Sequence, residues 1–245
     1  MHLEVPGCSV YYEVTGDSGL PVVMLWNGAW CSLRMWDPVL EQLSDQFRFV
    51  TMDTRGVGQS DATEVPELEY TLDTYSNDAV QLLDELGIEQ CHVCGQAWGA
   101  RAAMAFAGLN TSRVQSLLLF DASIDKADVE AQKVGHEIAM ERQRATGMVD
   151  FPLPKGWNIH KHPAEVPLAL AAIRAFDLAE NLQQLTMPVL IATGDCDPNL
   201  ASSRKIADQL SHAELKVLQN VGHGSVRQRP DLAIGLMSSF IGSDT

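Results

Sequence analysis

Cys94-Gly95-Gln96-Ala97-Trp98-Gly99-Ala100 is the stretch that decides the fold, because it predicts a tight turn between a buried strand and a helix. Residues 91–94 suit a short buried strand, and the alanine-rich run 100–107 favours a helix. Glycines at 95 and 99 allow the strand and the helix to approach closely, and a turn of this kind commonly presents a nucleophile at its centre. The central residue here is Ala97, whose methyl group can neither attack a carbonyl carbon nor accept a proton.

Strands and helices alternate on both sides of this turn. Apolar runs predict strands over residues 9–14, 22–26, 47–52, 114–120, 188–193 and 215–221. Helical patterns lie between them, over 36–43, 79–86, 202–210 and 230–241. The run 22–26 is continuously apolar, as in a strand that is covered on both faces. Since parallel neighbours need helical crossovers, this order predicts an α/β fold with a mostly parallel sheet flanked by helices.

The alternation lapses between residues 122 and 185. Helical segments are predicted there over 126–144 and 165–179, separated by a stretch that contains Pro152, Pro154 and Gly156. A chain of 245 residues, 46% of them hydrophobic, can bury one substantial core. We therefore predict one core formed by residues 1–121 and 186–245, with a small helical cap inserted at 122–185.

The charge and hydropathy of the chain limit the classes of partner that it can be expected to bind. The net charge is −15, which disfavours nucleic acid and anionic membranes because such sites rely on clustered Lys and Arg. The N-terminus has no basic segment followed by an apolar run, and no apolar stretch is long enough to span a bilayer. These features predict a cytoplasmic protein that acts on a small molecule, and they leave its oligomeric state open.

Two pairs of residues have a spacing that resembles that of metal ligands. Cys91 and Cys94 lie on one predicted strand, where residues three apart point to opposite faces, and the five cysteines are scattered, as expected for free thiols. His160 and His162 lack a third ligand at a defined spacing. We expect neither a metal nor another cofactor.

Four stretches, each after a predicted strand, stand in the order found in the α/β-hydrolase fold superfamily, which the chain resembles along nearly its whole length. They are Asn27-Gly28-Ala29, where many members have His-Gly-X, the loop 53–60, which matches Asp-X-Arg-Gly-X-Gly-X-Ser, the turn at Ala97, and the pair Asp197 and His223. The small cap and the Arg-Gly-X-Gly loop are most similar to those of the small enol-lactonases and esterases.

The resemblance implies an acid–base pair. His223, after the last strand, corresponds to the base, and Asp197, after the preceding strand, to the acid that orients it. Asp121 is the alternative acid, because some members supply the acid from the end of the strand before. Asp195, earlier in the same turn as Asp197, ranks below Asp197. Loop aspartates also close turns and cap helices, so a purely structural role is open for each.

The resemblance also implies the surroundings of the reacting carbonyl. The backbone N–H groups of Ala29 and Trp98 correspond to oxyanion donors, which side-chain substitutions leave in place. Asn27, Trp30 and Asp121 are expected at the substrate pocket. The tryptophans near these loops indicate a small apolar or aromatic substrate.

Ala97 remains to be explained, since ester or lactone cleavage in this fold requires a nucleophile at that position. The first hypothesis, and our prediction, is a serine hydrolase in which alanine replaces the serine, so that the chain itself is inactive. The second is a natural alanine with chemistry that needs only His223 as a base, such as a lyase step or cofactor-free oxygenation. The third is a ligand-binding protein that retains the pocket.

Overall fold

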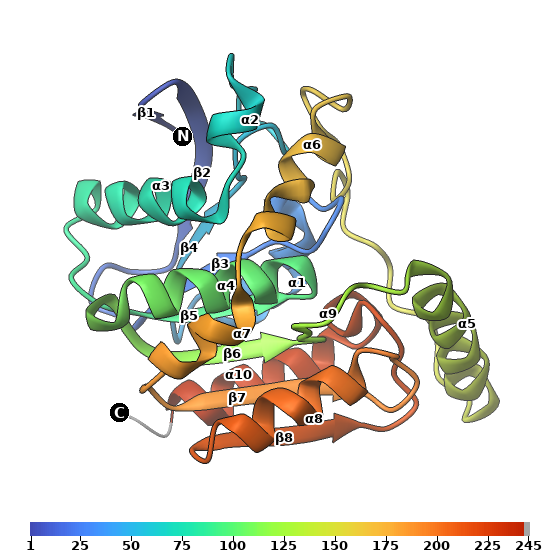
Figure 1. Ribbon diagram of the computed structural model, residues 1–245. Coiled ribbons are helices and arrows are strands. Elements are labelled where there is room, and N and C mark those ends of the chain that lie inside the picture. Colours follow the sequence, from blue (N-terminus) through green and yellow to red (C-terminus); the bar gives the residue numbers. More distant parts are fainter. Residues whose placement is uncertain (243–245) are drawn as a thin grey trace.

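The computed structural model describes residues 1–242 and is built around an eight-stranded sheet in the order β1-β2-β4-β3-β5-β6-β7-β8 (Figure 1). The strands are β1 (His2–Val5), β2 (Cys8–Thr15), β3 (Val22–Trp26), β4 (Arg48–Met52), β5 (Cys91–Gln96), β6 (Val114–Phe120), β7 (Val189–Gly194) and β8 (Ala213–Leu218). Strands β3 to β8 pair in parallel, whereas β1 and β2 run antiparallel at one edge. The predicted α/β class with a mostly parallel sheet is confirmed, and β1 is an additional strand.

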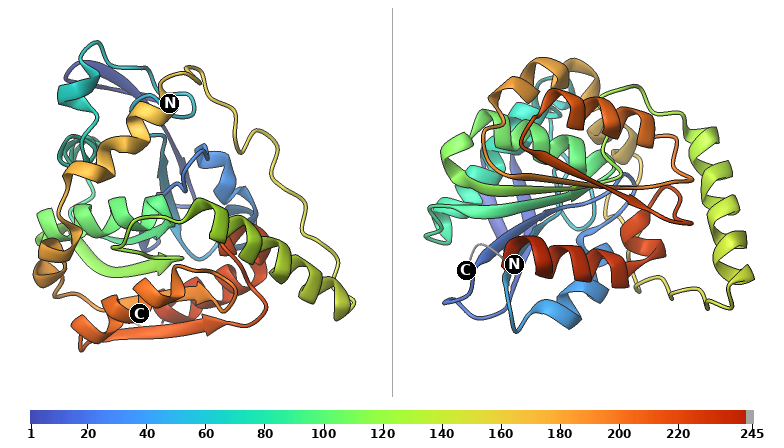
Figure 2. Two further views of the ribbon diagram at one scale, coloured as in Figure 1. Left: turned by 45° about the vertical axis from the view of Figure 1, so that its right-hand side comes forward. Right: turned by 90° about the horizontal axis from the view of Figure 1, so that it is seen from below.

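Helices cover both faces of the sheet (Figures 1 and 2). On one face α1 (Asp37–Leu43) packs beside α10 (Pro230–Gly242), and on the other lie α3 (Leu72–Glu85), α4 (Trp98–Leu109) and α8 (Leu200–Gln209). Each face has its own hydrophobic cluster. Cys91 belongs to one cluster and Cys94 to the other, and both are free thiols, so the strand geometry separates them as the sequence predicts.

The segment between β6 and β7 is helical but more broken than the sequence suggests. It contains α5 (Val129–Ala145), α6 (Val166–Leu170), α7 (Leu178–Asn181) and the 3-10 turns η3 (Ala171–Ala175) and η4 (Leu182–Gln184). The single helix expected over 165–179 is wrong, because Phe176 is extended and Asp177 caps a new helix by accepting from the Glu180 N–H at 3.0 Å.

The sequence patterns predict none of the shortest helices outside the segment between β6 and β7. These are η1 (Leu33–Trp36), α2 (Pro66–Glu69), η2 (Thr111–Arg113) and α9 (Ser225–Gln228). Elements of three or four residues are too short to show a helical period. None of the helices in the described part of the chain combines the length and the apolar character needed to cross a membrane.

Helix α5 stands at the side of the domain rather than over the sheet (Figure 2). Two glycines let it touch the loops that follow β7 and β8. A Cβ on Gly135 would lie 2.0 Å from the carbonyl oxygen of Cys196, and one on Gly222 would lie 2.6 Å from the Cα of His136. The helix therefore rests directly on the backbone of both loops.

The chain after α5 returns along residues 155–162 and is fastened to two other loops. The Ser32 N–H donates to the Trp157 carbonyl at 2.7 Å, and the Ser32 hydroxyl to that of Gly156 at 2.9 Å. Further along, the Gly58 N–H donates to Nδ1 of His160 at 3.0 Å. These bonds hold the segment against the loops that follow β3 and β4.

Candidate active site

Backbone strain is concentrated at the carboxyl edge of the sheet. Among residues 1–242, four that are not glycine have a positive φ: Trp30 (61°), Ala97 (54°), Asp121 (53°) and Asn220 (57°). They lie in the loops that leave β3, β5, β6 and β8 at the same edge. Strain of this kind clusters at functional sites, and ligands of open α/β sheets bind at the carboxyl ends of the strands. This edge is the candidate site.

The turn at Ala97 has the geometry that the sequence predicts. Ala97 lies at φ 54° and ψ −109° between β5 and α4, and its N–H donates to the Phe120 carbonyl at 2.8 Å. The flanking glycines are required sterically. A Cβ on Gly95 would lie 2.3 Å from the carbonyl oxygen of Gly99, and one on Gly99 would lie 2.3 Å from that of Trp26. Ala97 keeps 7% of its surface exposed, so it can be reached by a small molecule.

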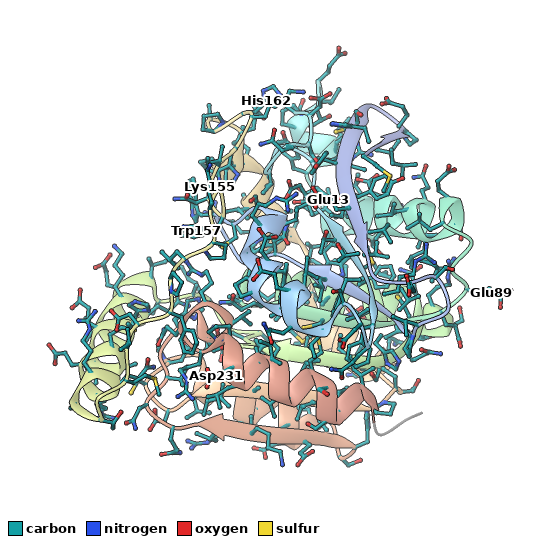
Figure 3. All side chains as sticks on the ribbon, turned by 180° about the vertical axis from the view of Figure 1, so that it is seen from behind. Glu13, Glu89, Lys155, Trp157, His162 and Asp231 are labelled. Carbon is teal, nitrogen blue, oxygen red and sulfur yellow. The ribbon has the colours of Figure 1, made fainter. Side chains whose placement is uncertain are left out.

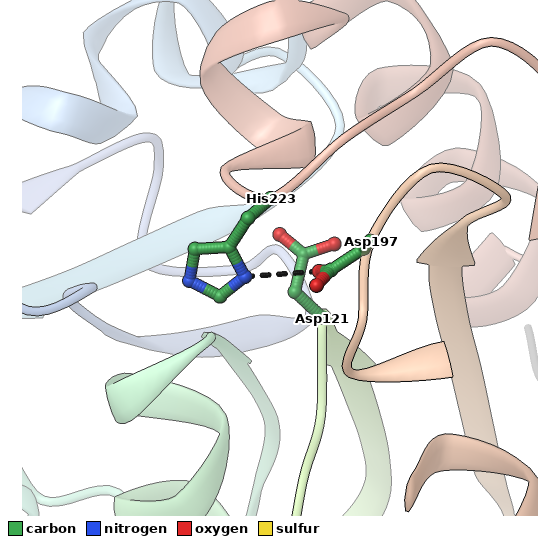
Figure 4. A group of neighbouring side chains, drawn as sticks. All are labelled: Asp121, Asp197 and His223. Atoms are coloured by element: carbon green, nitrogen blue, oxygen red, sulfur yellow. Dashed lines mark hydrogen bonds and ion pairs between the residues drawn. The ribbon is translucent and has the colours of Figure 1, made fainter. Parts of the chain in front are cut away.

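His223 and Asp197 form the closest pair of titratable groups at this edge. Their Nδ1 and Oδ2 atoms lie 2.9 Å apart (Figure 4). The second carboxylate oxygen of Asp197 accepts from the Asn199 N–H at 2.9 Å, which fixes its orientation. Asp195 instead accepts from the Val221 N–H at 3.3 Å. The geometry thus pairs the imidazole with the aspartate that ranks first in the sequence.

The protonation of His223 follows from this contact. Burial lowers the pKa of the imidazole, but the bond to Asp197 and the negative charges of Asp121 and Asp197 outweigh it, and the pKa rises above its usual value of 6.5. When Nδ1–H donates to Asp197, the lone pair of the neutral ring lies on Nε2. The imidazole side chain is 21% exposed, so Nε2 is available as a base.

Asp121 holds the histidine loop, residues 222–225 around His223, through hydrogen bonds to the loop backbone. Its Oδ2 accepts from the N–H groups of Gly224 at 3.0 Å and Ser225 at 2.8 Å, and from Nε2 of Gln96 at 3.3 Å. Burial, reinforced by the charge of Asp197, raises its pKa to about 6. This differs from the expectation of a pocket residue or an alternative acid. Asp121 is fully buried, and its carboxylate is directed to the loop backbone, whereas Nδ1 of His223 bonds Asp197.

Two backbone donors remain free at the edge. Within the described chain, neither the N–H of Ala29 nor that of Trp98 donates to a protein acceptor, whereas the N–H of Gly28 is occupied by the sulfur of Met35 at 3.1 Å. Ala29 is exposed in the loop after β3, and Trp98 opens α4. Free N–H groups at these two positions suit a developing negative charge on a carbonyl oxygen.

Asn27 braces the loop that carries Ala29. Its Nδ2 donates to the Met52 carbonyl at 3.0 Å and to the Asp53 carboxylate at 3.1 Å, and its Oδ1 accepts from Nε1 of Trp36 at 3.2 Å. We expected Asn27 at the substrate pocket, but its amide is buried and directed into the protein. An asparagine can therefore hold this loop where histidine is common.

The two tryptophans nearest the turn differ in their surroundings. Trp98 is fixed to the segment between β6 and β7, because its Nε1 donates to the Leu170 carbonyl at 2.9 Å. Its ring packs on that of Tyr75, with the two ring centres 6.1 Å apart. Trp30 is 50% exposed and free to meet a ligand. A cavity of about 310 Å³ lies near the loops that follow β3 and β4, and its lining includes neither Trp30 nor Trp98. It is lined by Tyr11, Ser32, Leu33, Arg34, Asp53, Gln59, Lys155, Gly156 and Ile159.

Asp121, Asp197 and His223 are also the one group of three in residues 1–242 whose ligand atoms are close enough to share a metal ion, within 4.8 Å of one another. These atoms, however, bond each other and backbone N–H groups, and N–H donors repel a cation. The donor set fits a hydrogen-bonded acid–base network. His160 belongs to no such group and accepts from the Gly58 N–H.

Sequence reasoning missed Gln96, Arg227 and Trp157, which lie around this site. Gln96 links the turn to Asp121. Arg227 stacks on the ring of Trp157 at 4.4 Å and lies beside the histidine loop. The position of Gln96 inside the turn motif and the arginine four residues after His223 were the available signals, but their partners are far away in the sequence.

Comparisons with known proteins agree with this architecture. A family model for the alpha/beta hydrolase fold matches residues 21–136. The chain is 25% identical to 3-oxoadipate enol-lactonase 1 of Acinetobacter baylyi, with 97% of this chain and 94% of that protein aligned. The crystal structure of an enol-lactonase from Burkholderia xenovorans gives a TM-score of 0.81 at 24% identity, covering 99% and 100% of the two chains. A hydrolase from Pseudomonas aeruginosa also gives 0.81, at 25% identity and 99% and 98% coverage. The chain has the α/β-hydrolase fold.

Proposed function

We propose that the chain carries the site of a hydrolase for a small apolar or aromatic ester or lactone, with Ala97 at the position of a nucleophilic serine. The observation that carries the proposal is the bond of 2.9 Å between His223 and Asp197 at the same edge as a strained turn. Two free N–H groups, of Ala29 and Trp98, provide the oxyanion donors, so that the nucleophile is the one missing part of the set that acyl transfer requires. The similarity to an enol-lactonase supports this class of reaction.

The chemistry requires one oxygen that the chain lacks. In an Ala97→Ser variant, Nε2 of His223 would take the proton of the new hydroxyl while its oxygen attacks the substrate carbonyl carbon. The N–H groups of Ala29 and Trp98 would stabilise the resulting oxyanion. The imidazolium, held by Asp197, would pass its proton to the leaving alkoxide, and water would cleave the acyl-enzyme by the same steps.

The decisive experiment measures hydrolysis of chromogenic esters and lactones by this chain and by Ala97→Ser. We expect turnover by Ala97→Ser and none by the chain itself. An inactive Ala97→Ser variant with a native circular dichroism spectrum and melting temperature would contradict the proposal. His212 is exposed on the surface, so His212→Ala in the Ala97→Ser background is the control for a general effect of substitution.

A second candidate function follows from the same pair. The chain keeps an available base at His223 and two oxyanion donors without a nucleophile at the turn, an arrangement that suits proton abstraction from a substrate carbonyl compound, a lyase step or cofactor-free oxygenation. Turnover by the Ala97 chain that disappears in His223→Ala would favour this reaction class. Ligand binding without turnover in every variant would favour a binding protein.

The rate of the Ala97→Ser variant is expected to depend on pH through His223. The base must be neutral, so kcat/KM should rise with pH through the raised pKa, with a midpoint above 6.5. Asp197→Asn removes both the bond and the charge that raise this pKa, and it should move the midpoint to lower pH. Asp208 is exposed on α8, so Asp208→Asn removes one charge at a distance and should leave the midpoint unchanged. A pH profile measured between 5 and 9 tests this, and an unshifted midpoint in Asp197→Asn would contradict it.

A further inference from the structure

Arg227 is a cation beside the candidate site that has no carboxylate partner in the described chain. No ion pair joins it to another residue in 1–242, and its buried Nε has no hydrogen-bond acceptor. This is unusual in a chain with 32 acidic and 17 basic residues. The nearby Arg229 bonds Asp231 twice, at 2.8 and 2.7 Å. The buried Nε–H is costly, because this donor has left water without a replacement acceptor.

The cap holds this guanidinium in place. Its central carbon lies 4.4 Å from the centre of the Trp157 ring. Trp157 is fixed in turn by the Ser32 N–H, which donates to its carbonyl at 2.7 Å. Figure 3 shows Trp157, Lys155 and His162 along the segment that returns from α5. Stacking on a ring uses the face of the guanidinium and leaves the N–H groups at its edge free to bind an anion.

The guanidinium lies beside the loop that carries His223, and its charge reaches the loop after β3. A Cβ on Gly224, the residue after His223, would lie 3.0 Å from Nη2 of Arg227, so glycine leaves room for this approach. The positive charge acts on both sides, tending to lower the pKa of the His223 imidazole and of the Cys31 thiol. The Cys31 sulfur in turn lies 3.4 Å from the carbonyl oxygen of Ala29. An anion on Arg227 would therefore be close to the base and to the oxyanion loop.

We propose that Arg227, stacked on Trp157, binds a carboxylate carried by the substrate itself. This inference rests on the proposed function and specifies the substrate class as an ester or lactone with a free carboxylate at some distance from the scissile bond. One guanidinium presents a fork of donors that matches one carboxylate. A monoanion suits a site with a single cation in a strongly acidic protein, whereas a phosphate dianion calls for more positive charge. The tryptophan ring supports the apolar part of such a substrate.

The kinetic test uses paired esters in the Ala97→Ser background. The charged probes are the mono-4-nitrophenyl esters of adipic and suberic acid, and the neutral probes carry an isopropyl group in place of the carboxylate. We expect kcat/KM to favour the charged probes by about tenfold or more, the value of a charge-assisted bond. Arg227→Gln should abolish this preference, because any effect that acts through His223 changes the rates of the charged and the neutral probes alike. Arg204 is exposed on α8 and forms no ion pair within residues 1–242, so Arg204→Gln removes the same charge and should keep the preference.

A binding measurement separates this proposal from the function on which it rests. Monomethyl adipate is titrated calorimetrically into the Ala97 chain, where no hydrolysis is expected, and into its Arg227→Gln and Arg227→Lys variants. Weaker binding by about tenfold or more in Arg227→Gln, with part of the affinity kept by Arg227→Lys, supports the carboxylate site even if Ala97→Ser is inactive. Equal hydrolysis of charged and neutral probes by an active Ala97→Ser, or equal binding by all three chains, would overturn the carboxylate site and leave the hydrolase proposal standing.

Discussion

Replacing His223 by alanine in an Ala97→Ser chain is expected to lower kcat for ester hydrolysis by about 10³- to 10⁴-fold. Without Nε2, no group at the edge removes the proton of the introduced hydroxyl, and a neutral serine is a weak nucleophile. The N–H groups of Ala29 and Trp98 would still polarise the carbonyl, so a residual rate above that in water should persist. Burst and steady-state kinetics on one chromogenic ester measure the effect.

Replacing Asp197 by asparagine in the Ala97→Ser chain should also lower kcat for ester hydrolysis. Asp197→Asn keeps the shape of the side chain but presents an amide to Nδ1, which favours the wrong tautomer of the imidazole.

His212→Ala is the matched control for His223→Ala because the His212 side chain is exposed, and it should change kcat less than about twofold. If Ala97→Ser keeps its rate after His223→Ala, another group must be the base and the assignment of the pair is wrong.

Gly99→Ala is expected to destabilise the protein by more than about 3 kcal/mol or to prevent folding. The new methyl group would lie 2.3 Å from the carbonyl oxygen of Trp26 and 2.4 Å from that of Asn27. Both contacts are with backbone, so no side chain can turn aside, and relief would require β3 and α4 to separate. Urea denaturation followed by circular dichroism gives the free energy of unfolding.

Gly235 provides the matched control for that substitution. It lies in α10, and a Cβ there would meet nothing within 4 Å. Gly235→Ala should stabilise the protein by up to about 1 kcal/mol, because alanine loses less entropy than glycine in a helix. If Gly99→Ala unfolds at the same urea concentration as the unaltered chain, the close packing of the turn is not what fixes the fold.

The parts of the site that could be predicted are those that depend on chain order. Each predicted strand ends at the same edge in a parallel sheet, so residues just after those ends must meet. Chain order alone therefore places Ala97, Asp197 and His223 at one edge. The sequence also ranks Asp197 above Asp195 and Asp121, and the structure pairs Nδ1 of His223 with Asp197.

What escaped prediction depends on contacts between distant residues. Asp121 is directed to the N–H groups of Gly224 and Ser225, more than 100 residues later, so its position after a strand could not show that it supports a loop. Asn27 is likewise held by Met52 and Asp53. The position of the Arg227 guanidinium depends on Trp157, which lies in the segment between β6 and β7. A residue type and its spacing suggest which chemistry is possible, but neither shows in which direction a side chain points.

The contact of α5 with the loops after β7 and β8 couples this helix to the position of the acid–base pair. Gly135 and Gly222 bring the helix against the backbone next to Asp197 and His223, and Nε2 of Gln228 lies 2.7 Å from the His223 carbonyl and 2.8 Å from His136 on α5. The position of α5 is therefore coupled to the alignment of His223, and a displacement of the helix would also misalign the base.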